Sequence, residues 1–344
     1  AMERLPRSPL PVRSSARQQA MALLASLAEQ PEPAVRPAPR KALSLIQKGL
    51  GWFAQRWPSL ILLAVLLVAW NLPVPQLEVT PVNQQAFEFV DRSIKPADTR
   101  NPAIVLMAYD WEAYRAAEMR PLALALTRHL LKGKAQIIAV STTFQGGQLA
   151  QEVWESARQG SGYEGLDYGD DFVNLAMRPG NETALRLLAT ETLSHTFPVD
   201  FAFAQPSRRY ALVQRARSLQ NASLLVIMAG EESQAISWLE QVRSQYPGKP
   251  CLLVVPADLT PLVQPYMQAR ETAPDVALWG LPAALEYEAL LWDRYGITPN
   301  RELPLERRLT LLAVAELSLA VLIVLGNLAQ MGAAMGDLRK GSPR

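Results

Sequence analysis

Two apolar segments, one near each end of the chain, constrain this sequence more than any other feature. Residues 57–77 contain no charged side chain, and residues 309–336 contain one, Glu316. About 20 predominantly apolar residues are needed to cross the hydrocarbon core of a bilayer. Both segments are long enough, so we predict one transmembrane helix at 58–77 and a second at 309–336, with the lipid bilayer as their surroundings.

The second apolar segment also carries small and polar residues suited to packing against another helix. Small side chains four residues apart let helix backbones approach closely, and amide or carboxyl groups can hydrogen-bond across such a contact. This pattern predicts a membrane-protein partner, although a simple pair of helices would also tolerate it. The candidate helix-packing residues are Gly326, Ala329, Gly332, Gly336, Asn327 and Glu316.

Basic residues around the first segment predict the orientation. Four of them lie between residues 40 and 56, whereas the first basic residue after the segment is Arg92. Lys and Arg accumulate on the cytoplasmic side of spans. We therefore expect the bacterial inner membrane, with both termini in the cytoplasm and the large central part outside it. Arg307 and Arg308, before the second segment, argue for the opposite orientation.

The regions outside the two apolar segments and the central domain show little pattern typical of a folded domain. Residues 1–40 are rich in proline and charge and are predicted to be a disordered cytoplasmic tail. Residues 41–57 place apolar and aromatic side chains on one helical face, which is typical of an amphipathic helix in the membrane interface. The alternative for 41–57 is an extension of the transmembrane helix. Residues 337–344 form a second cytoplasmic tail.

Residues 78–305 read as an extracytoplasmic α/β domain. Strand-length apolar runs without polar alternation indicate strands that are buried on both faces, as in a parallel sheet between helices. The runs alternate with helical patterns, so the fold class is α/β: a three-layer, doubly wound, mainly parallel sheet with flavodoxin-like topology, flanked by the two transmembrane helices. The predicted strands are 103–109, 135–142, 172–177, 223–230, 250–256 and 276–280.

Local signals predict where the helices begin and end. Pro121 disfavours a helix interior, so 110–119 and 121–132 are expected to be separate helices. Asn181 and Thr260 are expected to cap the helices that follow them. The remaining predicted helices are 147–157, 182–193, 208–219, 233–246, 260–269 and 282–292.

Polar residues follow several of the predicted strands. Ligands of doubly wound sheets bind beyond the carboxyl ends of the strands, and carboxylate oxygens there would hold a hard cation. The competing interpretation is that these acids cap the next helices, where the helix dipole favours them. The candidate ligand or cation residues are Asp110, Glu112, Thr142, Glu231 and Asp258.

Other site chemistries lack sequence support. Residues 75–308 hold 22 basic and 27 acidic side chains, a net charge of about −5, which argues against nucleic-acid binding. No glycine-rich phosphate loop follows the first strand, so no cofactor is expected. Cys251 is predicted to be a buried, inert thiol, His129 to lie at the surface or at its boundary, and His195 to end a helix. No metal motif and no catalytic set is evident, which favours a role other than catalysis.

Together these features predict a non-catalytic, membrane-anchored scaffold or assembly subunit of a bacterial membrane complex. Its α/β domain would be the docking surface, and its second transmembrane helix would contact the partner. The alternative is a membrane-anchored enzyme or a sensor of a ligand or cation, with its site at the carboxyl edge of the sheet.

Overall fold

The computed structural model of the chain describes residues 61–71, 78–95, 101–159, 163, 165–269, 271–298 and 305–340. The predicted tail at 1–40 and the predicted interfacial helix at 41–57 lie outside the described residues. So do both ends of the first apolar segment and residues 341–344.

A six-stranded parallel sheet forms the centre of the α/β domain. Each strand coincides with one of the apolar runs, so all six strand predictions are confirmed. The sheet order is β3-β2-β1-β4-β5-β6, and every neighbouring pair is parallel. The strands are β1 (Ile104–Asp110), β2 (Gln136–Ser141), β3 (Phe172–Met177), β4 (Leu224–Ala229), β5 (Cys251–Val255) and β6 (Val276–Trp279).

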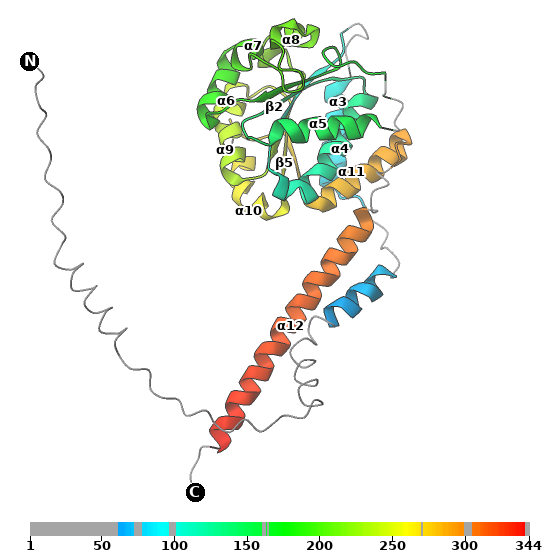
Figure 1. Ribbon diagram of the computed structural model, residues 1–344, viewed down its shortest axis with the longest axis vertical. Helices are drawn as coiled ribbons and strands as arrows, with labels where there is room; N and C mark the ends of the chain where they lie inside the picture. Colours follow the sequence, from blue (N-terminus) through cyan, green and yellow to red (C-terminus); the bar gives the residue numbers. More distant parts are fainter. Residues whose placement is uncertain are drawn as a thin grey trace, which may run out of the picture. The chain divides into compact units, whose positions relative to one another are not determined.

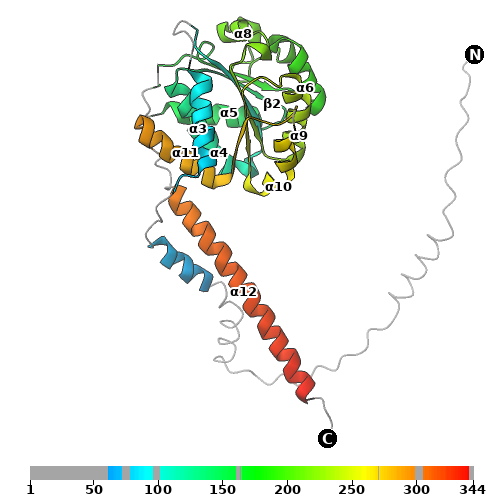
Figure 2. The same cartoon turned by 180° about the vertical axis from the view of Figure 1, so that it is seen from behind.

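Helices cover both faces of this sheet, which confirms the three-layer arrangement (Figures 1 and 2). The helices on one face are α3 (Pro81–Ile94), α4 (Ala116–Lys132), α5 (Gly146–Arg158) and α11 (Gly280–Tyr295). The helices on the other face are α6 (Asn181–Thr190), α7 (Leu193–Thr196), α8 (Ala211–Ala216), α9 (Glu232–Gln241) and α10 (Thr260–Val263).

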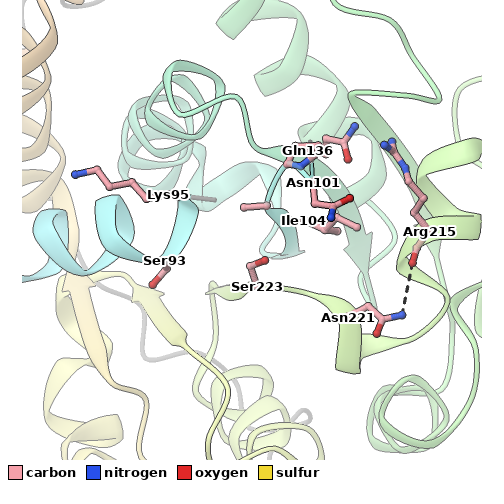
Figure 3. A pocket seen from close by; sticks show the side chains of 10 residues that line it. Ser93, Lys95, Asn101, Ile104, Gln136, Arg215, Asn221 and Ser223 are labelled. Atoms are coloured by element: carbon pink, nitrogen blue, oxygen red, sulfur yellow. Dashed lines mark hydrogen bonds between the residues drawn. The ribbon is translucent and has the colours of Figure 1, made fainter. Parts of the chain in front are cut away.

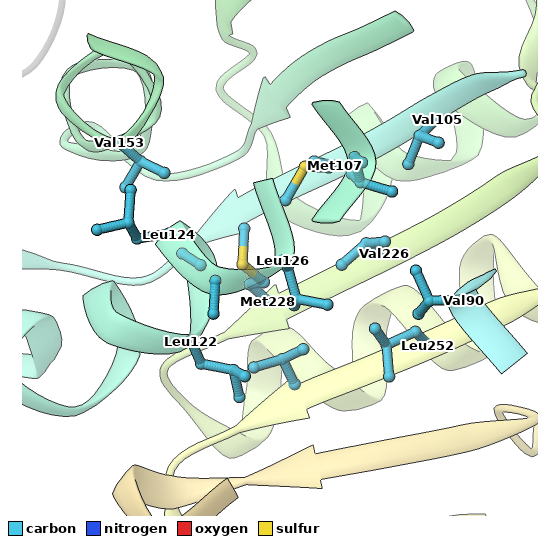
Figure 4. Close-up of a cluster of buried hydrophobic side chains, with 14 of the residues drawn as sticks. Val90, Val105, Met107, Leu122, Leu124, Leu126, Val153, Val226, Met228 and Leu252 are labelled. Atoms are coloured by element: carbon cyan, nitrogen blue, oxygen red, sulfur yellow. The ribbon is translucent and has the colours of Figure 1, made fainter. Parts of the chain in front are cut away.

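Side chains of successive strand residues enter two separate cores. Val105 and Met107 of β1 pack beneath α3, α4 and α5, as Figure 4 shows, whereas Leu106 and Ala108 face the opposite helices. A strand alternates its side chains between the two faces of its sheet. Because both faces are covered, both sets must be apolar, and this explains why the strands show no polar alternation.

The winding of the sheet reverses between β1 and β4. From β1 the chain proceeds through β2 to β3 on one side, and from β4 through β5 to β6 on the other. This is the 3-2-1-4-5-6 order of doubly wound sheets, whose ligand crevice lies at the point of reversal, outside the carboxyl ends of the strands. Strand order by itself carries no function. It does locate the crevice beside Asp110, the last residue of β1.

Several helix boundaries differ from the expected ones. Pro121 lies inside α4, so the prediction of two separate helices is wrong. The lost backbone bond falls in the first turns of the helix, and burial of the following leucines outweighs it. Neither Asn181 nor Thr260 caps a helix through its side chain: Asn181 is the first residue of α6, with φ +42°, and Thr260 lies within α10.

Three predicted helices are shorter or broken. Residues 182–193 are divided between α6 and α7, and residues 208–219 contain α8 between two single turns of 3-10 helix. Residues 260–269 form α10 followed by a 3-10 segment, Gln264–Gln268. Pro261 and Pro265 interrupt the last of these segments, and local turns interrupt the other two. A short helix costs little to interrupt.

Helix α3 has no counterpart among the sequence predictions. A carboxylate that lies 206 positions later in the sequence binds the start of α3. Glu286 of α11 accepts hydrogen bonds from the Thr80 backbone N–H and hydroxyl, both at 2.7 Å. The Asn83 side-chain amide donates to the same oxygen at 2.8 Å. The first amides of a helix need such acceptors, so this contact both caps α3 and attaches it to α11.

Replacing Glu286 with alanine should lower the free energy of unfolding by about 2 kcal/mol, because it leaves buried donors at the start of α3 without an acceptor. Glu286→Gln keeps one carbonyl acceptor and should cost less. Denaturant titration of the full chain in mild detergent measures both changes. Equal stability of Glu286→Ala and the unmodified chain would show that α3 does not depend on this contact.

The prediction that His129 lies at the surface or at its boundary is wrong. Its side chain is 1% exposed, stacks on Phe87 at 4.4 Å between ring centroids and hydrogen-bonds through Nδ1 to the Tyr287 hydroxyl at 2.7 Å. Its Nε2 lies 3.6 Å from a carboxylate oxygen of Asp91. Helices α3 and α11 cover the side of α4 that a two-sided helical pattern assigns to solvent.

Burial lowers the pKa of His129 to about 4, whereas an unfolded histidine titrates near 6.5. Between these values the unfolded chain binds a proton that the folded chain excludes, so the free energy of unfolding should fall as pH decreases through this window. The loss should reach up to about 3 kcal/mol. Stability measured from pH 7 to pH 4 tests this, and His129→Gln should flatten the profile. The exposed His195→Gln is the matched control, and an equal flattening there would contradict the assignment.

Two further helices belong to the apolar segments. Residues 61–70 are helical, and α12 (Leu305–Lys340) contains the whole second segment. Side chains of α12 are described for residues 307, 310–324 and 326–327. Within the part of the chain that the structure describes, no helix combines the length and the apolar character that a membrane span requires.

Candidate functional site

The carboxyl ends of β1, β2 and β4 meet at the reversal point and border a small crevice. Its volume is about 120 Å³, well below the roughly 300–1,000 Å³ of pockets that enclose larger organic ligands. The first turns of α6 and α9 form its other walls. Polar residues dominate the lining, among them Asp110, Thr142, Asn181, Glu231, Ser233 and Ser237.

Asp110 lies at this edge and has no exposed surface. Its carboxylate accepts hydrogen bonds from the Thr142 backbone N–H, from the Thr142 hydroxyl at 2.7 Å and from the Ser141 hydroxyl at 3.0 Å. The indole N–H of Trp238 donates to Oδ2, the oxygen that also accepts the Thr142 hydroxyl. Burial raises the pKa of Asp110, and the four donors act in the opposite direction by favouring the carboxylate. Asp110 therefore joins β1 and β2 to α9.

Glu231 caps the helix that follows it, as the second interpretation of the acidic residues predicts. Its side chain accepts the N–H of Gln234, and Gln234 in turn accepts the Glu231 N–H at 3.0 Å, which completes a reciprocal capping box. The Tyr114 hydroxyl also donates to Glu231, at 2.9 Å. The carboxylate of Glu231 is thus engaged at the rim of the crevice.

Asp258 and Glu112 lie apart from this group. Asp258 receives two hydrogen bonds from the Arg115 guanidinium, at 3.1 and 3.0 Å, in an exposed ion pair. Glu112 is half-buried in the loop that follows β1. Neither Glu112 nor Asp258 is among the described residues that line the crevice. The structure therefore brings together Asp110, Thr142 and Glu231.

The hydrogen bonds of the acidic residues at this edge favour a structural role over a cation site. No group of three or more acidic, histidine or cysteine side chains suited to a metal ion occurs among the described residues. Each of the three carboxylates Asp110, Glu231 and Asp258 has donors from within the domain. All three carboxylates therefore have partners within the domain, and the crevice between β1, β2 and α9 is small and polar.

Sequence reasoning included Thr142 among the candidates but missed Ser141 and Trp238 as donors to Asp110. Trp238 lies 128 positions away in the chain and reaches Asp110 only because α9 packs over β4. Its apolar neighbours make it resemble an ordinary core residue. Ser141 was within the predicted second strand, and its position beside β1 follows from the parallel register between β1 and β2. No local signal marks either residue as a ligand of Asp110.

The opposite edge of the sheet contains a larger groove of about 440 Å³. Polar and basic side chains line it, including Lys95, Gln136 and Arg215 (Figure 3). Arg215 donates to the Asp170 carbonyl at 3.2 Å, and the Gln136 amide donates to the same carbonyl at 2.8 Å. These contacts hold the amino ends of the strands to the surrounding loops.

The remaining candidates are placed as follows. Cys251, the first residue of β5, is fully buried, and burial raises its pKa to about 12, so it is the inert thiol expected. His195 is exposed in the last turn of α7. In α12, Glu316, Gly326 and Asn327 are exposed. The side-chain surroundings of Ala329, Gly332 and Gly336, also in α12, lie outside the described residues.

Comparison of the chain with protein-family models, with curated proteins and with solved structures finds no match.

Proposed function

We propose that the protein is a non-catalytic, membrane-anchored assembly subunit of a bacterial membrane complex. Segments 58–77 and 309–336 would hold it in the inner membrane, with the α/β domain on the extracytoplasmic side and both termini in the cytoplasm. The domain would serve as the docking body, and the second segment would pack against a membrane-protein partner.

The observation that carries this proposal is the exposure of large apolar side chains on both segments. Leu67 is 61% exposed and Leu317 is 68% exposed. A helix that is apolar around its whole circumference is either buried in protein or surrounded by lipid. At about 100° per residue, the exposed large apolar side chains of α12 cover a little more than half of its circumference, and the exposed Glu316 lies within the same arc. They are Leu312, Leu317, Leu319, Val321, Ile323 and Val324.

The two segments also contact each other where they approach the domain. The Arg307 guanidinium donates to the Trp70 carbonyl at 3.1 Å and lies 5.4 Å from the centre of the Trp70 ring. Leu63, Leu67 and Leu312 line an apolar groove between the two helices. An arginine and a tryptophan are side chains suited to the boundary between lipid and water. This contact supports adjacent entry of both segments into the bilayer.

The polar edge of the domain supports a role other than catalysis. Catalysis needs groups held for use by a substrate, with protonation tuned to the reaction. Here Asp110 is fully buried and accepts four hydrogen bonds from the domain itself, and Glu231 is used as a cap. These carboxylates explain how the strands are tied to the helices.

Purification in mild detergent tests the assembly role. The full chain should co-purify with another membrane protein in a fixed ratio, and Gly332→Ile should weaken that association, because a bulky side chain prevents close helix approach. Ala334→Ile is the matched control, since it lies two residues away and about 200° around the helix. A monomeric particle without a partner, or equal effects of both variants, would contradict the proposal.

The crevice at Asp110 favours one alternative, a sensor of a small polar ligand or a hard cation. Its lining offers hydroxyl, amide and carboxylate oxygens within about 120 Å³. The melting temperature of the full chain in detergent should then rise with one divalent cation or metabolite, and Thr142→Val should reduce that rise. An unchanged melting temperature across such a series would remove this alternative.

A further inference from the structure

The path of the chain brings one edge of the sheet close to the end of the first apolar segment. Thr80 hydrogen-bonds to Glu286, which lies in the second turn of α11, and α11 follows the carboxyl end of β6 directly. Thr80 is therefore near the carboxyl edge of the sheet. Two residues lie between Thr80 and Leu77, and an extended chain covers about 10 Å over these three steps. If segment 58–77 spans the bilayer, this edge must lie at the membrane surface.

Exposed hydrophobic side chains are found at this same edge. Tyr114 follows β1, Phe144 follows β2 and Leu262 follows β5, each on the connection that leaves the carboxyl end of its strand. Val82 lies in the first turn of α3, two residues from Thr80. Their exposed fractions are 62% for Tyr114, 81% for Phe144, 45% for Leu262 and 51% for Val82.

The amino edge of the sheet is different in character. Its groove is lined by Lys95, Gln136, Arg215 and other polar groups (Figure 3). Among the described residues near this edge, the exposed large hydrophobic is Trp292, in the last turn of α11. The remaining exposed ones of the domain, Val199, Phe201 and Phe203, lie on the loop beside β3. The two edges therefore suit different surroundings.

Carboxylates at the carboxyl edge are largely engaged within the domain. Asp258 is paired with Arg115, Glu231 accepts the Tyr114 hydroxyl, and Glu118 accepts the Ala257 N–H at 2.8 Å. Arg115 balances the charge of Asp258, whereas the neutral donors to Glu231 and Glu118 leave those two carboxylates charged. Aromatic side chains with one polar end, such as Tyr114, are favoured at the depth of the headgroups.

We propose that the carboxyl edge of the sheet rests on the lipid headgroups, with Val82, Tyr114, Phe144 and Leu262 inserted into the interface. The partner is the bilayer itself. This inference rests on the proposed anchorage by segments 58–77 and 309–336, and it goes further by fixing which edge of the domain faces the membrane. The crevice at Asp110 then opens toward the lipid surface, and the polar amino edge faces the aqueous side.

Site-directed labelling of the full chain in vesicles tests this orientation. The native thiol, Cys251, is fully buried, so a single introduced cysteine can carry an environment-sensitive fluorophore. Phe144→Cys places it at the carboxyl edge, on a highly exposed side chain. Gly248→Cys is the matched control, because it is exposed before the amino end of β5 and a Cβ there meets nothing within 4 Å. The vesicles contain phosphatidylcholine with a minor fraction of phosphatidylglycerol.

Three measurements are made on each labelled chain: flotation with the vesicles, quenching by an aqueous collisional quencher and quenching by headgroup-depth spin-labelled lipid. We expect both chains to float. The label at 144 should be quenched several-fold less than the label at 248 by the aqueous quencher and several-fold more by the lipid quencher.

Other outcomes overturn the inference in distinguishable ways. Equal aqueous quenching at both positions in a floating chain refutes the contact with lipid and leaves the anchorage standing. Protection of position 144 from both quenchers shows that protein, rather than lipid, covers this edge. A chain that does not float refutes the anchorage, and the inference is then refuted with it.

Discussion

Replacing Asp110 with alanine should lower the free energy of unfolding by about 3–5 kcal/mol. The change removes the acceptor for the Thr142 N–H and hydroxyl and for the Trp238 indole N–H at a fully buried position, while the Ser141 hydroxyl keeps the Tyr109 carbonyl as an acceptor at 2.9 Å. A buried donor without an acceptor keeps its desolvation cost and gains nothing in return. Denaturant titration of the full chain in mild detergent, followed by far-UV circular dichroism, measures the loss.

Asp258→Ala is the matched control, since it removes an aspartate from the same edge of the sheet. Asp258 has a 58% exposed side chain, and its partner is Arg115. An exposed ion pair contributes about 1 kcal/mol or less, so this variant should remain close to the unmodified chain. Similar losses for the two variants would show that the Asp110 hydrogen bonds do not join β1 and β2 to α9 in the way described.

Gly146→Ala should also be strongly destabilising, by about 3 kcal/mol. A Cβ at Gly146 would lie 2.0 Å from the Ser141 hydroxyl oxygen and 2.1 Å from the Tyr109 carbonyl oxygen, so the start of α5 would have to move away from β1 and β2. Helix propensity alone predicts the opposite sign, because alanine is favoured over glycine in helices by about 1 kcal/mol. The expected loss therefore measures the close packing of α5 against the strand ends.

Gly248→Ala provides the comparison, because a Cβ there would meet nothing within 4 Å. Its stability should stay within about 0.5 kcal/mol of the unmodified chain. Thermal unfolding of the two variants side by side gives the answer. A Gly146→Ala chain as stable as Gly248→Ala would mean that α5 does not begin against Ser141.

The strands could be predicted from sequence because their physical signal is local. Each lies within an apolar run of strand length, and burial on both faces removes the polar alternation that would otherwise be expected. The helices were less predictable. Pro121 is tolerated inside α4 because packing outweighs one lost bond, and α3 is held by Glu286, about 200 residues away in the chain.

The environment of His129 shows the same limit. The amphipathic pattern of a helix indicates the face that packs on the sheet. It does not indicate that a second face is buried beneath further helices. Here the further helices are α3 and α11, whose Phe87 and Tyr287 enclose the ring. Without α3, the amphipathic pattern of α4 assigns the His129 side chain to solvent.

The candidate site was partly predictable. Asp110, Thr142 and Glu231 follow β1, β2 and β4, and the carboxyl ends of neighbouring parallel strands must meet. Asp258 follows β5, one strand further away, and its pairing with Arg115 depends on side-chain geometry. Trp238 reaches Asp110 from α9 through tertiary packing, which no local pattern specifies.

Alkaline carbonate extraction of membranes from a bacterial host that produces the full chain tests the proposed anchorage most directly. We predict that the chain stays in the membrane pellet and is released only by detergent, because the proposed transmembrane segments 58–77 and 309–336 would be surrounded by lipid. Release of a folded, monomeric chain into the carbonate supernatant would contradict the anchorage and the assembly role derived from it.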